Sequence, residues 1–486
     1  MTNIVKYIEF QGGILSGELA EYIANVYKIE NSAARKRVER LTSPVHKLKG
    51  LFSDNQSFLY LSDNYNSQNY FESLEEAFRT SAKRCYAVII AINYNHGIIL
   101  KSDLANYTFS PTSKIKGHLL YSTLIDKLQK VGVLAEYDEL HFCLNNYISE
   151  NINPNYRHCK SLQFVKSLVL NQFSTWSKNI GLCSFNTGQL NKEVGGFQFS
   201  FASPTYLNGL VTYKNGKPMP GFLVADILIG NTTSTKEIDF FLQKINAIRA
   251  SNPTIKLLPV LIVDGVDIHA LNSLKEKGVL IATIREIFGE SYNELLKNLI
   301  NTITNAGAIL KKDPESFIVL MEKLTKLVDG KTNNLRGDLF EMAVGFYYGR
   351  LCQSLDIGLR IRIENDDKVR EIDVLANFEN EVRVIECKGY NYPIEKDYVE
   401  QYLSEKIPAV RKWLERVYPN KKQVFEIWST GGFDVEATEL LEKAKNNTRK
   451  YAVDYLDKTQ ILEKANQLKS NKFSEILKNY YFKEIV

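Results

Sequence analysis

The chain has 486 residues, which is enough for three or four domains that each bury a core. Charged residues make up 24% and hydrophobic residues 44%, as in ordinary folded proteins, and a formal net charge of +5 does not identify a nucleic-acid partner by itself. The six cysteines form no C-x-x-C pair and no zinc-like pattern with histidine, so we expect free thiols in a cytoplasmic protein. We expect no secretory signal and no membrane association.

Residues 1–63 predict a small helical unit that ends in a β-hairpin. The expected elements are helices from Ile4 and from Ser16, a helix over 33–41, and strands over 48–52 and 57–61. This is the element order of a winged helix, in which the third helix can enter the major groove of DNA. The candidate DNA-binding residues on that helix are Arg35, Lys36, Arg37 and Arg40. The alternatives are a solvated charged face and a winged helix that binds protein.

Residues 70–150 predict a second unit of the same kind. The expected elements are one long helix over 74–93, a repeat at 97–104 of the pattern at 13–19, a helix over 121–131, and a hairpin of strands 133–137 and 140–144. The sequence therefore predicts two tandem winged helices. Lys114 and Lys116, before the last helix, are further candidates for contact with the DNA backbone.

Residues 155–305 predict an α/β domain. A helix over 161–176 is followed by alternating apolar strands and helices: strands 197–201, 221–229, 257–263 and 279–283, and helices 236–250 and 268–277. The strand over 221–229 contains one acid, Asp226, with no lysine two residues later.

Residues 312–330 predict a linker helix, 314–328, between this domain and the last one. Its apolar side can pack on a neighbouring element or form a homodimer interface, and consists of Phe317, Leu320, Met321, Leu324 and Leu327. The tail over 473–486 is amphipathic, and we expect it to close the core of the last domain.

Residues 334–486 carry the acids that we single out. A strand over 371–376 contains Asp373, and the next strand, 382–389, contains Glu386 and Lys388, which point to the same face because side chains alternate along a strand. A hairpin places Asp373 beside them. Two buried carboxylates repel each other unless a cation lies between them, and Mg²⁺ prefers one or two carboxylates together with water and phosphate. The alternative is a buried ion pair in an α/β core.

This arrangement resembles the PD-(D/E)XK nuclease superfamily, which has the restriction-endonuclease-like fold, over residues 334–465. The resemblance implies that Asp373 and Glu386 bind Mg²⁺, with Mn²⁺ as a substitute, that Lys388 is catalytic, and that Glu341 is an accessory acid. Ile372 stands where the family name has proline, and Gln401 with Tyr398 and Tyr402 resembles polar residues that some members carry on the following helix. Residues 155–305 have the same element order, so we expect two nuclease-like domains, the first without the catalytic motif.

The fold class that we predict is thus multidomain α/β, with tandem winged helices before two restriction-endonuclease-like domains. The expected function is that of a metal-dependent DNA endonuclease that hydrolyses phosphodiester bonds in bacterial restriction or antiviral defence. DNA is the expected partner, and a homodimer is a further possibility. The sequence contains no phosphate-binding G-x-x-x-x-G-K-[ST] loop, so any energy for movement along DNA must come from a partner ATPase or another subunit of a defence system. The alternatives are a non-enzymatic winged-helix regulator and an RNA-directed nuclease.

Overall fold

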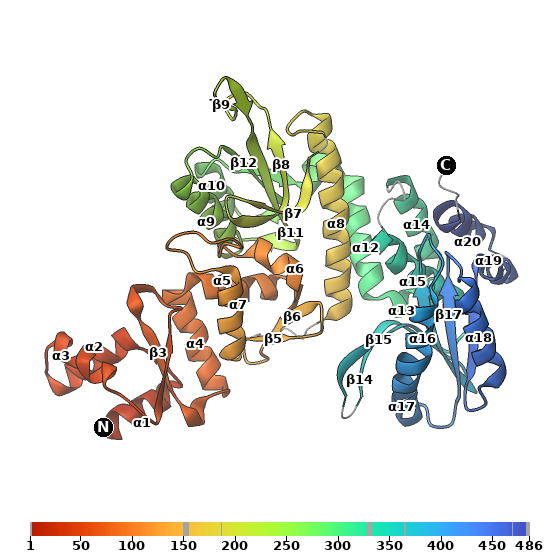
Figure 1. Cartoon of the computed structure of the whole chain (residues 1–486), viewed down its shortest axis with the longest axis horizontal. Helices are drawn as coiled ribbons and strands as arrows, with labels where there is room; N and C mark the ends of the chain where they lie inside the picture. The colour runs from red at the N-terminus through yellow and green to blue at the C-terminus, as the bar shows by residue number, and fades with distance from the viewer. Residues whose placement is uncertain are drawn as a thin grey trace. The chain divides into compact units, whose positions relative to one another are not determined.

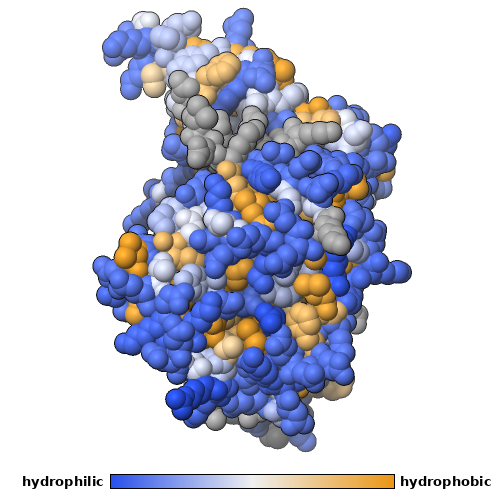
Figure 2. Space-filling view, turned by 90° about the vertical axis from the view of Figure 1, so that its right-hand side faces the viewer, coloured by the Kyte–Doolittle hydropathy of each residue, from blue (hydrophilic) through white to orange (hydrophobic). Residues whose placement is uncertain are grey.

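The computed structural model describes residues 2–148, 155–185, 187–327, 333–363, 366–468 and 470–482. The chain is a mixed α/β multidomain protein, as predicted at that level, and divides into two compact units, residues 1–293 and 294–486 (Figure 1). None of the six cysteines forms a disulfide. Hydrophilic residues cover most of the face drawn in Figure 2, and apolar residues form separate patches. Among the described helices, none has both the length and the apolar character that a membrane crossing requires.

The first module of unit 1 has three helices and a three-stranded sheet. Its elements are α1 (Thr2–Gln11), β1 (Ile14–Leu15), α2 (Ser16–Tyr27), α3 (Asn31–Glu39), β2 (Val45–Lys49) and β3 (Ser57–Leu61), with strand order β1-β3-β2. Ile8, Leu19, Ile23 and Leu59 form its fully buried centre. Val26 stands at helical spacing from the buried Leu19 and Ile23 but is exposed, because α2 ends one residue later and Lys28 takes a left-handed conformation.

The second module repeats this arrangement. Its elements are α4 (Gln68–Ser81), α5 (Lys83–Tyr94), β4 (Ile98–Leu100), α6 (Lys101–Leu104), α7 (Tyr121–Lys130), β5 (Leu134–Glu136) and β6 (His141–Leu144), with strand order β4-β6-β5. The prediction of one helix over 74–93 is wrong, because Ala82 leaves the helical conformation (φ −141°, ψ 60°) and separates α4 from α5. Phe78 and Cys85, on either side of the break, are both buried, so the two helices pack into one hydrophobic core.

The third part of unit 1 is a five-stranded sheet with helices. Its elements are α8 (Tyr156–Asn179), β7 (Gln189–Val194), β8 (Phe197–Thr205), β11 (Gly221–Thr233), α9 (Thr235–Ser251), β12 (Leu257–Val266), α10 (Ile268–Glu276), β13 (Leu280–Thr283) and α11 (Ile284–Phe288). The strand order is β13-β12-β11-β8-β7; β7, β8 and β11 are antiparallel, and β11, β12 and β13 are parallel.

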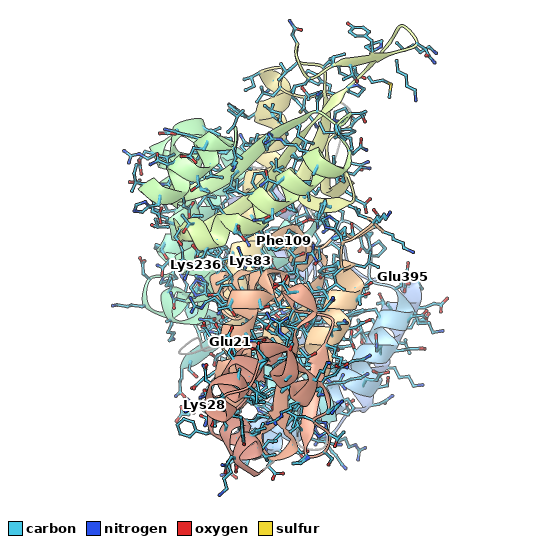
Figure 3. The ribbon with its side chains drawn as sticks, turned by 90° about the vertical axis from the view of Figure 1, so that its left-hand side faces the viewer. Glu21, Lys28, Lys83, Phe109, Lys236 and Glu395 are labelled. Carbon is cyan, nitrogen blue, oxygen red and sulfur yellow. The ribbon has the colours of Figure 1, made fainter. Side chains whose placement is uncertain are left out.

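Two features of this part were not predicted from the sequence: β7, and a hairpin that lies outside this sheet. The hairpin consists of β9 (Thr212–Lys214) and β10 (Lys217–Met219), which pair only with each other, and it extends at the top of Figures 1 and 3. Asn215 and Gly216 form its turn with positive φ angles of 52° and 73°, the conformation for which Asn-Gly is favoured.

Unit 2 contains a second five-stranded sheet of the same topology. Its strands are β14 (Ser354–Ile363), β15 (Asp366–Asn377), β16 (Glu381–Lys388), β17 (Lys422–Ser429) and β18 (Ala452–Leu456), in that order. As in unit 1, three antiparallel strands are followed by two parallel ones. The remaining elements are α12 (Glu290–Thr304), which begins in unit 1, α13 (Ala306–Lys312), α14 (Glu315–Leu327), α15 (Asn333–Gly349), α16 (Lys396–Gln401), a π-helical turn (Tyr402–Lys406), α17 (Ile407–Val417), α18 (Val435–Asn447), α19 (Lys458–Gln467), α20 (Asn471–Ile476) and a second π-helical turn (Leu477–Tyr481).

The predicted linker helix is α14, and it belongs to unit 2. Its apolar side is buried there: Phe317, Leu320, Met321 and Leu324 are each at most 5% exposed, and the ring of Phe317 lies 5.7 Å from that of Phe346. This side is therefore not exposed for the homodimer interface that the sequence suggested. The side chain of Leu327 and residues 328–330 lie outside the described residues.

The C-terminal segment closes the core of unit 2, and Arg336 connects it to the end of β16. Arg336 is 6% exposed and donates from Nε to the carbonyl oxygen of Gly389 (3.1 Å) and from its two Nη atoms to those of Tyr480 (2.8 Å) and Tyr481 (2.9 Å). Gly389 follows Lys388 directly, and a Cβ atom there would lie 2.6 Å from the carbonyl oxygen of Arg336. Three distant segments are thus fixed to one another. Residues 483–486 lie outside the described residues.

We predict that Arg336→Met loosens this contact. Three buried carbonyl groups lose a charged donor, and hydrogen bonds to charged groups contribute about 1.5–3 kcal/mol each, so unit 2 should lose about 3 kcal/mol or more. Hydrogen exchange should become faster in residues 470–482, whereas the control Lys443→Met, at an exposed position of α18, should leave exchange unchanged. Equal protection in wild type and Arg336→Met would refute the role of Arg336.

Candidate active site

The candidate site lies where the ladder between β15 and β16 stops. The last pair toward the site is Val374 with Ile385, and the next residue on each strand is an acid, Asp373 and Glu386. The backbone N–H of Cys387 donates to Oδ2 of Asp373 (2.8 Å). A side-chain carboxylate therefore takes the place of a strand partner at this end of the sheet, and the two acids are only 7% and 3% exposed.

Three side chains contact the carboxylate of Glu386. Oε1 accepts a hydrogen bond from the hydroxyl of Tyr398 (2.5 Å) and lies 2.9 Å from Nζ of Lys388, and Oε2 accepts from Nζ of Lys406. Glu386 and Lys388 thus lie on one face of β16, as strand alternation predicts. Burial by itself would raise the pKa of Glu386, but the ammonium groups of Lys406 and Lys388 hold it below its usual range.

Asp373 is in a different electrostatic position. Burial, and then the negative charge of Glu386, raise its pKa to about 6, although Lys406 and Lys388 act in the opposite direction. Burial lowers the pKa of Lys388, but Glu386 and Asp373 outweigh it and hold that pKa well above the usual value. Two buried carboxylates that resist joint ionisation favour an added positive charge between them.

Asp373 and Glu386 are the residues here that could hold a divalent metal ion. In the described part of the chain, no three or more His, Cys, Asp or Glu side chains are grouped to hold a metal. A bound Mg²⁺ would have these two carboxylates as protein ligands, and water and phosphate would complete its coordination.

Glu341 lies on α15, half-buried. Burial first, and then the charges of Asp373 and Glu341, hold the pKa of the Cys387 thiol well above its ordinary value. The charge of Glu341 therefore acts on the residue between Glu386 and Lys388. Cys387 itself is buried, which makes it a packing residue.

Lys406 was not among the predicted site residues. Three residues of the following helix that were predicted as one group separate in the structure: Tyr398 contacts Glu386, the hydroxyl of Tyr402 donates to the carbonyl oxygen of Glu426 (3.2 Å), and Gln401 is exposed. A signal for Lys406 was present, because Tyr398, Tyr402 and Lys406 recur every four residues, as on one face of a helix.

The corresponding strand of unit 1 carries Asp226 at a sealed position. Asp226 lies on β11 and is fully buried, as is Lys244 from α9, whose Nζ is 2.5 Å from Oδ2 of Asp226. Oδ1 accepts hydrogen bonds from the backbone N–H and the hydroxyl of Ser200 (2.8 and 2.9 Å). Lys244 also donates to the carbonyl oxygens of Asn106 (2.7 Å) and Gln198 (2.8 Å). This buried ion pair connects the sheet to the second module through Asn106, as a contact that stabilises the fold does.

The predicted DNA-binding residues occur in two separate modules. Arg35, Lys36 and Arg37 are exposed on α3, and Arg40 is exposed at its C-terminal cap. The exposed Lys114 and Lys116 precede α7, next to Thr112 and Ser113, whose hydroxyls donate to Glu193 (2.7 and 2.9 Å).

A groove of about 940 Å³ runs beside Arg35 in the first module. Lys47 and Lys49 of β2 also line it, but so do Glu18, Glu21 and Glu39 (Glu21 marks α2 in Figure 3, and Lys28 directly follows this helix). The charge of this groove is therefore mixed, and the exposed basic residues Arg35, Lys36 and Arg37 follow one another on α3.

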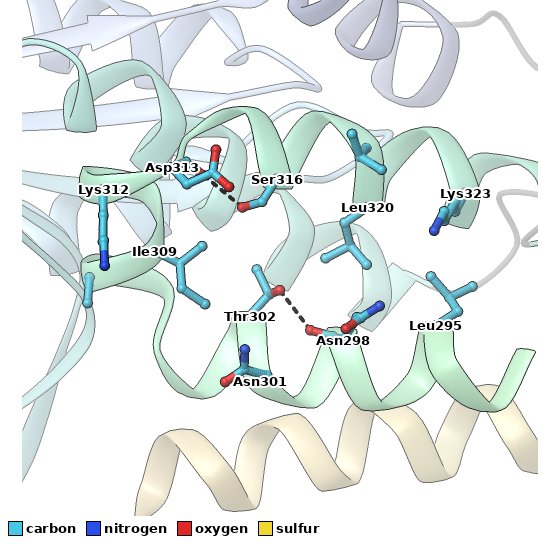
Figure 4. A pocket seen from close by; sticks show the side chains of 12 residues that line it. Leu295, Asn298, Asn301, Thr302, Ile309, Lys312, Asp313, Ser316, Leu320 and Lys323 are labelled. Atoms are coloured by element: carbon cyan, nitrogen blue, oxygen red, sulfur yellow. Dashed lines mark hydrogen bonds between the residues drawn. The ribbon is translucent and has the colours of Figure 1, made fainter. Parts of the chain in front are cut away.

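A second cavity, of about 520 Å³, lies between α12, α13 and α14 in unit 2 (Figure 4). Leu295, Ile309 and Leu320 line it together with Lys312 and Lys323. None of the four predicted catalytic residues borders this cavity, so it is separate from the candidate site.

Comparisons with known proteins give two distant structural likenesses. No protein-family model and no curated protein matches the chain. Protein VC1899 from Vibrio cholerae is 12% identical, with 49% of this chain and 55% of that chain covered, at a TM-score of 0.15. Can2 from Sulfobacillus thermosulfidooxidans, solved in complex with cyclic tetra-adenylate, is 13% identical, with 59% and 79% covered, at a TM-score of 0.17. The chain thus spans about half of VC1899, and neither likeness is close enough to carry an argument.

We predict that Asp226 and Lys244 are needed for stability as a pair. Asp226→Leu or Lys244→Met alone should destabilise unit 1 by about 3–5 kcal/mol, because each leaves an uncompensated buried charge. The double variant should recover at least half of that loss, since no lone charge remains. Urea unfolding of the three variants measures this, and additive losses in the double variant would contradict the assignment.

Proposed function

We propose that this protein is a metal-dependent nuclease that hydrolyses phosphodiester bonds, with DNA as its substrate. The observation that supports the proposal is the end of the β15–β16 ladder, where Asp373 and Glu386 are buried side by side and Lys388 contacts Glu386. Two acids share this position, and the pKa of Asp373 is raised to about 6 even though two lysines lie nearby, as expected for a site that takes up a further cation.

The roles of the residues follow from their contacts. Asp373 and Glu386 would hold Mg²⁺, or Mn²⁺ in its place, and the ion when bound would activate water and stabilise charge on the phosphate. Tyr398 orients the carboxylate of Glu386 through its hydrogen bond. Lys388 keeps a positive charge beside the two acids, where it can bind a phosphate oxygen or orient the attacking water. Glu341 adds negative charge on the α15 side.

The two N-terminal modules would hold the nucleic acid. Their element order is that of winged helices, and the basic residues of α3 are exposed, as phosphate contacts require. A nuclease joined to such modules suits restriction or antiviral defence. The competing proposals are a winged-helix regulator, in which Lys388 is only a salt-bridge partner of Glu386, and an RNA-directed nuclease.

The first test of the proposal is cleavage of double-stranded DNA, single-stranded DNA and RNA with Mg²⁺ or Mn²⁺. Wild type should cut DNA, chelator should abolish cutting, and Asp373→Asn and Lys388→Met should each lower the rate at least about 100-fold. The matched control is Glu395→Gln, an exposed acid at the start of α16, which should cut like wild type.

The outcomes of this test separate the three proposals. Cutting of RNA alone would replace DNA as the substrate. Binding of DNA without any cutting, by a wild type that also binds no metal, would favour the regulator.

A second prediction concerns the surface that holds DNA. Replacing Arg35 and Arg37 by Ala should weaken DNA binding and reduce the slope of log K against log salt by about 1.8, since each phosphate contact contributes about 0.9. Fluorescence anisotropy with Asp373→Asn as the background avoids cleavage during the measurement. Lys236→Ala, an exposed lysine of α9, is the control, and an unchanged slope in the double Arg variant would exclude α3 as the contact.

A further inference from the structure

The charge arrangement around Glu386 includes a second lysine that the proposed mechanism does not use. Lys388 contacts Oε1 of Glu386 from the same strand, and Lys406 contacts Oε2 from the turn between α16 and α17. Both oxygens of a candidate metal ligand are therefore in contact with ammonium groups. The side chains of Lys388 and Lys406 are 16% and 23% exposed, so solvent and a ligand can reach this side of Glu386.

The backbone around Lys406 is unusual. Residues Tyr402–Lys406 form a π-helical turn, in which the N–H of Ile407 bonds to the carbonyl oxygen of Tyr402, five residues earlier. Pro408 follows and has no N–H, so the α-helical bond to the carbonyl oxygen of Ser404 is missing. Such wide turns inside α-helices are frequent at functional sites. The sequence Lys406-Ile407-Pro408 thus places the lysine at the end of a local irregularity.

The sealed pair in unit 1 shows what a purely structural version of this contact looks like. Lys244 also reaches from the helix after the equivalent strand, and it is fully buried with three acceptors: Asp226, Asn106 and Gln198. Lys406 has one acceptor within the described residues, Glu386, and it is partly exposed. An ammonium group carries three N–H donors, so Lys406 retains donors for another oxygen.

We infer that Lys406 is a positioning residue that couples metal binding to nucleic-acid binding at this site, an inference that rests on the proposed nuclease function. In the free protein its charge holds the carboxylate of Glu386 in place and opposes the approach of a divalent cation. A bound phosphodiester offers the ammonium group a second anionic partner, which removes that opposition. The free protein therefore binds metal weakly, and nucleic acid strengthens metal binding.

The test is metal binding by isothermal titration calorimetry, without nucleic acid, to wild type, Lys406→Met and Lys406→Arg. Lys406→Met should bind Mn²⁺ at least about tenfold more tightly than wild type, because one repelling charge is gone. Lys406→Arg keeps the charge and should bind like wild type. Lys412→Met, an exposed lysine of α17, is the matched control and should also bind like wild type.

Cleavage supplies the second readout. At saturating Mn²⁺, Lys406→Met should have a KM for DNA raised at least about tenfold, because the phosphate loses a partner, whereas Lys406→Arg should stay near wild type. A third measurement replaces Mn²⁺ by Ca²⁺ and adds a short DNA duplex, under conditions in which the duplex is not cut. The duplex should tighten Ca²⁺ binding by wild type and leave Ca²⁺ binding by Lys406→Met unchanged; both proteins keep Asp373. Lys406→Gln replaces Lys406→Met if the Met variant melts at a lower temperature than wild type.

The outcomes separate the inference from the function on which it rests. Unchanged or weaker Mn²⁺ binding by Lys406→Met, with a wild type that cuts DNA, would overturn the inference and leave the nuclease intact. Tighter metal binding with an unchanged KM would overturn the coupling to nucleic acid. A wild type that neither binds metal nor cuts would overturn the nuclease proposal, and the inference with it.

Discussion

The arrangement of unit 2 depends on the burial of two negative charges at one end of a β-ladder. Charges that leave water must be paired, because the penalty for an isolated buried carboxylate far exceeds the energy of a hydrogen bond. The strand itself supplies Lys388, the crossover helix supplies Tyr398 and Lys406, and the backbone of Cys387 supplies an N–H that the ladder no longer uses. Positive charge converges on this point from separate segments, and the acids stay close together only because it does.

The same sheet topology occurs twice in the chain, with opposite solutions to that problem. On β11 a single acid, Asp226, meets a single base, Lys244, and backbone carbonyls take the remaining donors of the lysine. On β16 two acids, Asp373 and Glu386, lie with two lysines, Lys388 and Lys406, whose side chains are partly open to solvent. A sealed pair suits a permanent contact, whereas an accessible cluster suits a site whose charge changes when ligands arrive.

The sequence predicted those features that follow from local periodicity. Alternation along 382–389 placed Glu386 and Lys388 on one face, and the short loop before it placed Asp373 on the neighbouring strand, as the structure has them. Features set by distant packing were missed. Nothing at Ala82 signals a helix break, since neither glycine nor proline is present, and the apolar side of α14 is the same whether it packs internally or on another chain. Lys406 was predictable only in part. Its spacing from Tyr398 can be read from the sequence, whereas its contact with Glu386 on β16 depends on how the chain packs. The winged-helix and nuclease assignments stay predictions.

The contact of Arg336 with Gly389, Tyr480 and Tyr481 has a consequence for the order in which the chain matures during synthesis. The residue that follows Lys388 is held by an arginine whose other two acceptors are made more than ninety residues later. When β16 has just left the ribosome, the nascent chain therefore has the two acids and Lys388 but not yet the C-terminal segment that Arg336 binds. The N-terminal modules fold first, as is usual for chains made from that end, and the acidic site is completed only when residue 481 has emerged.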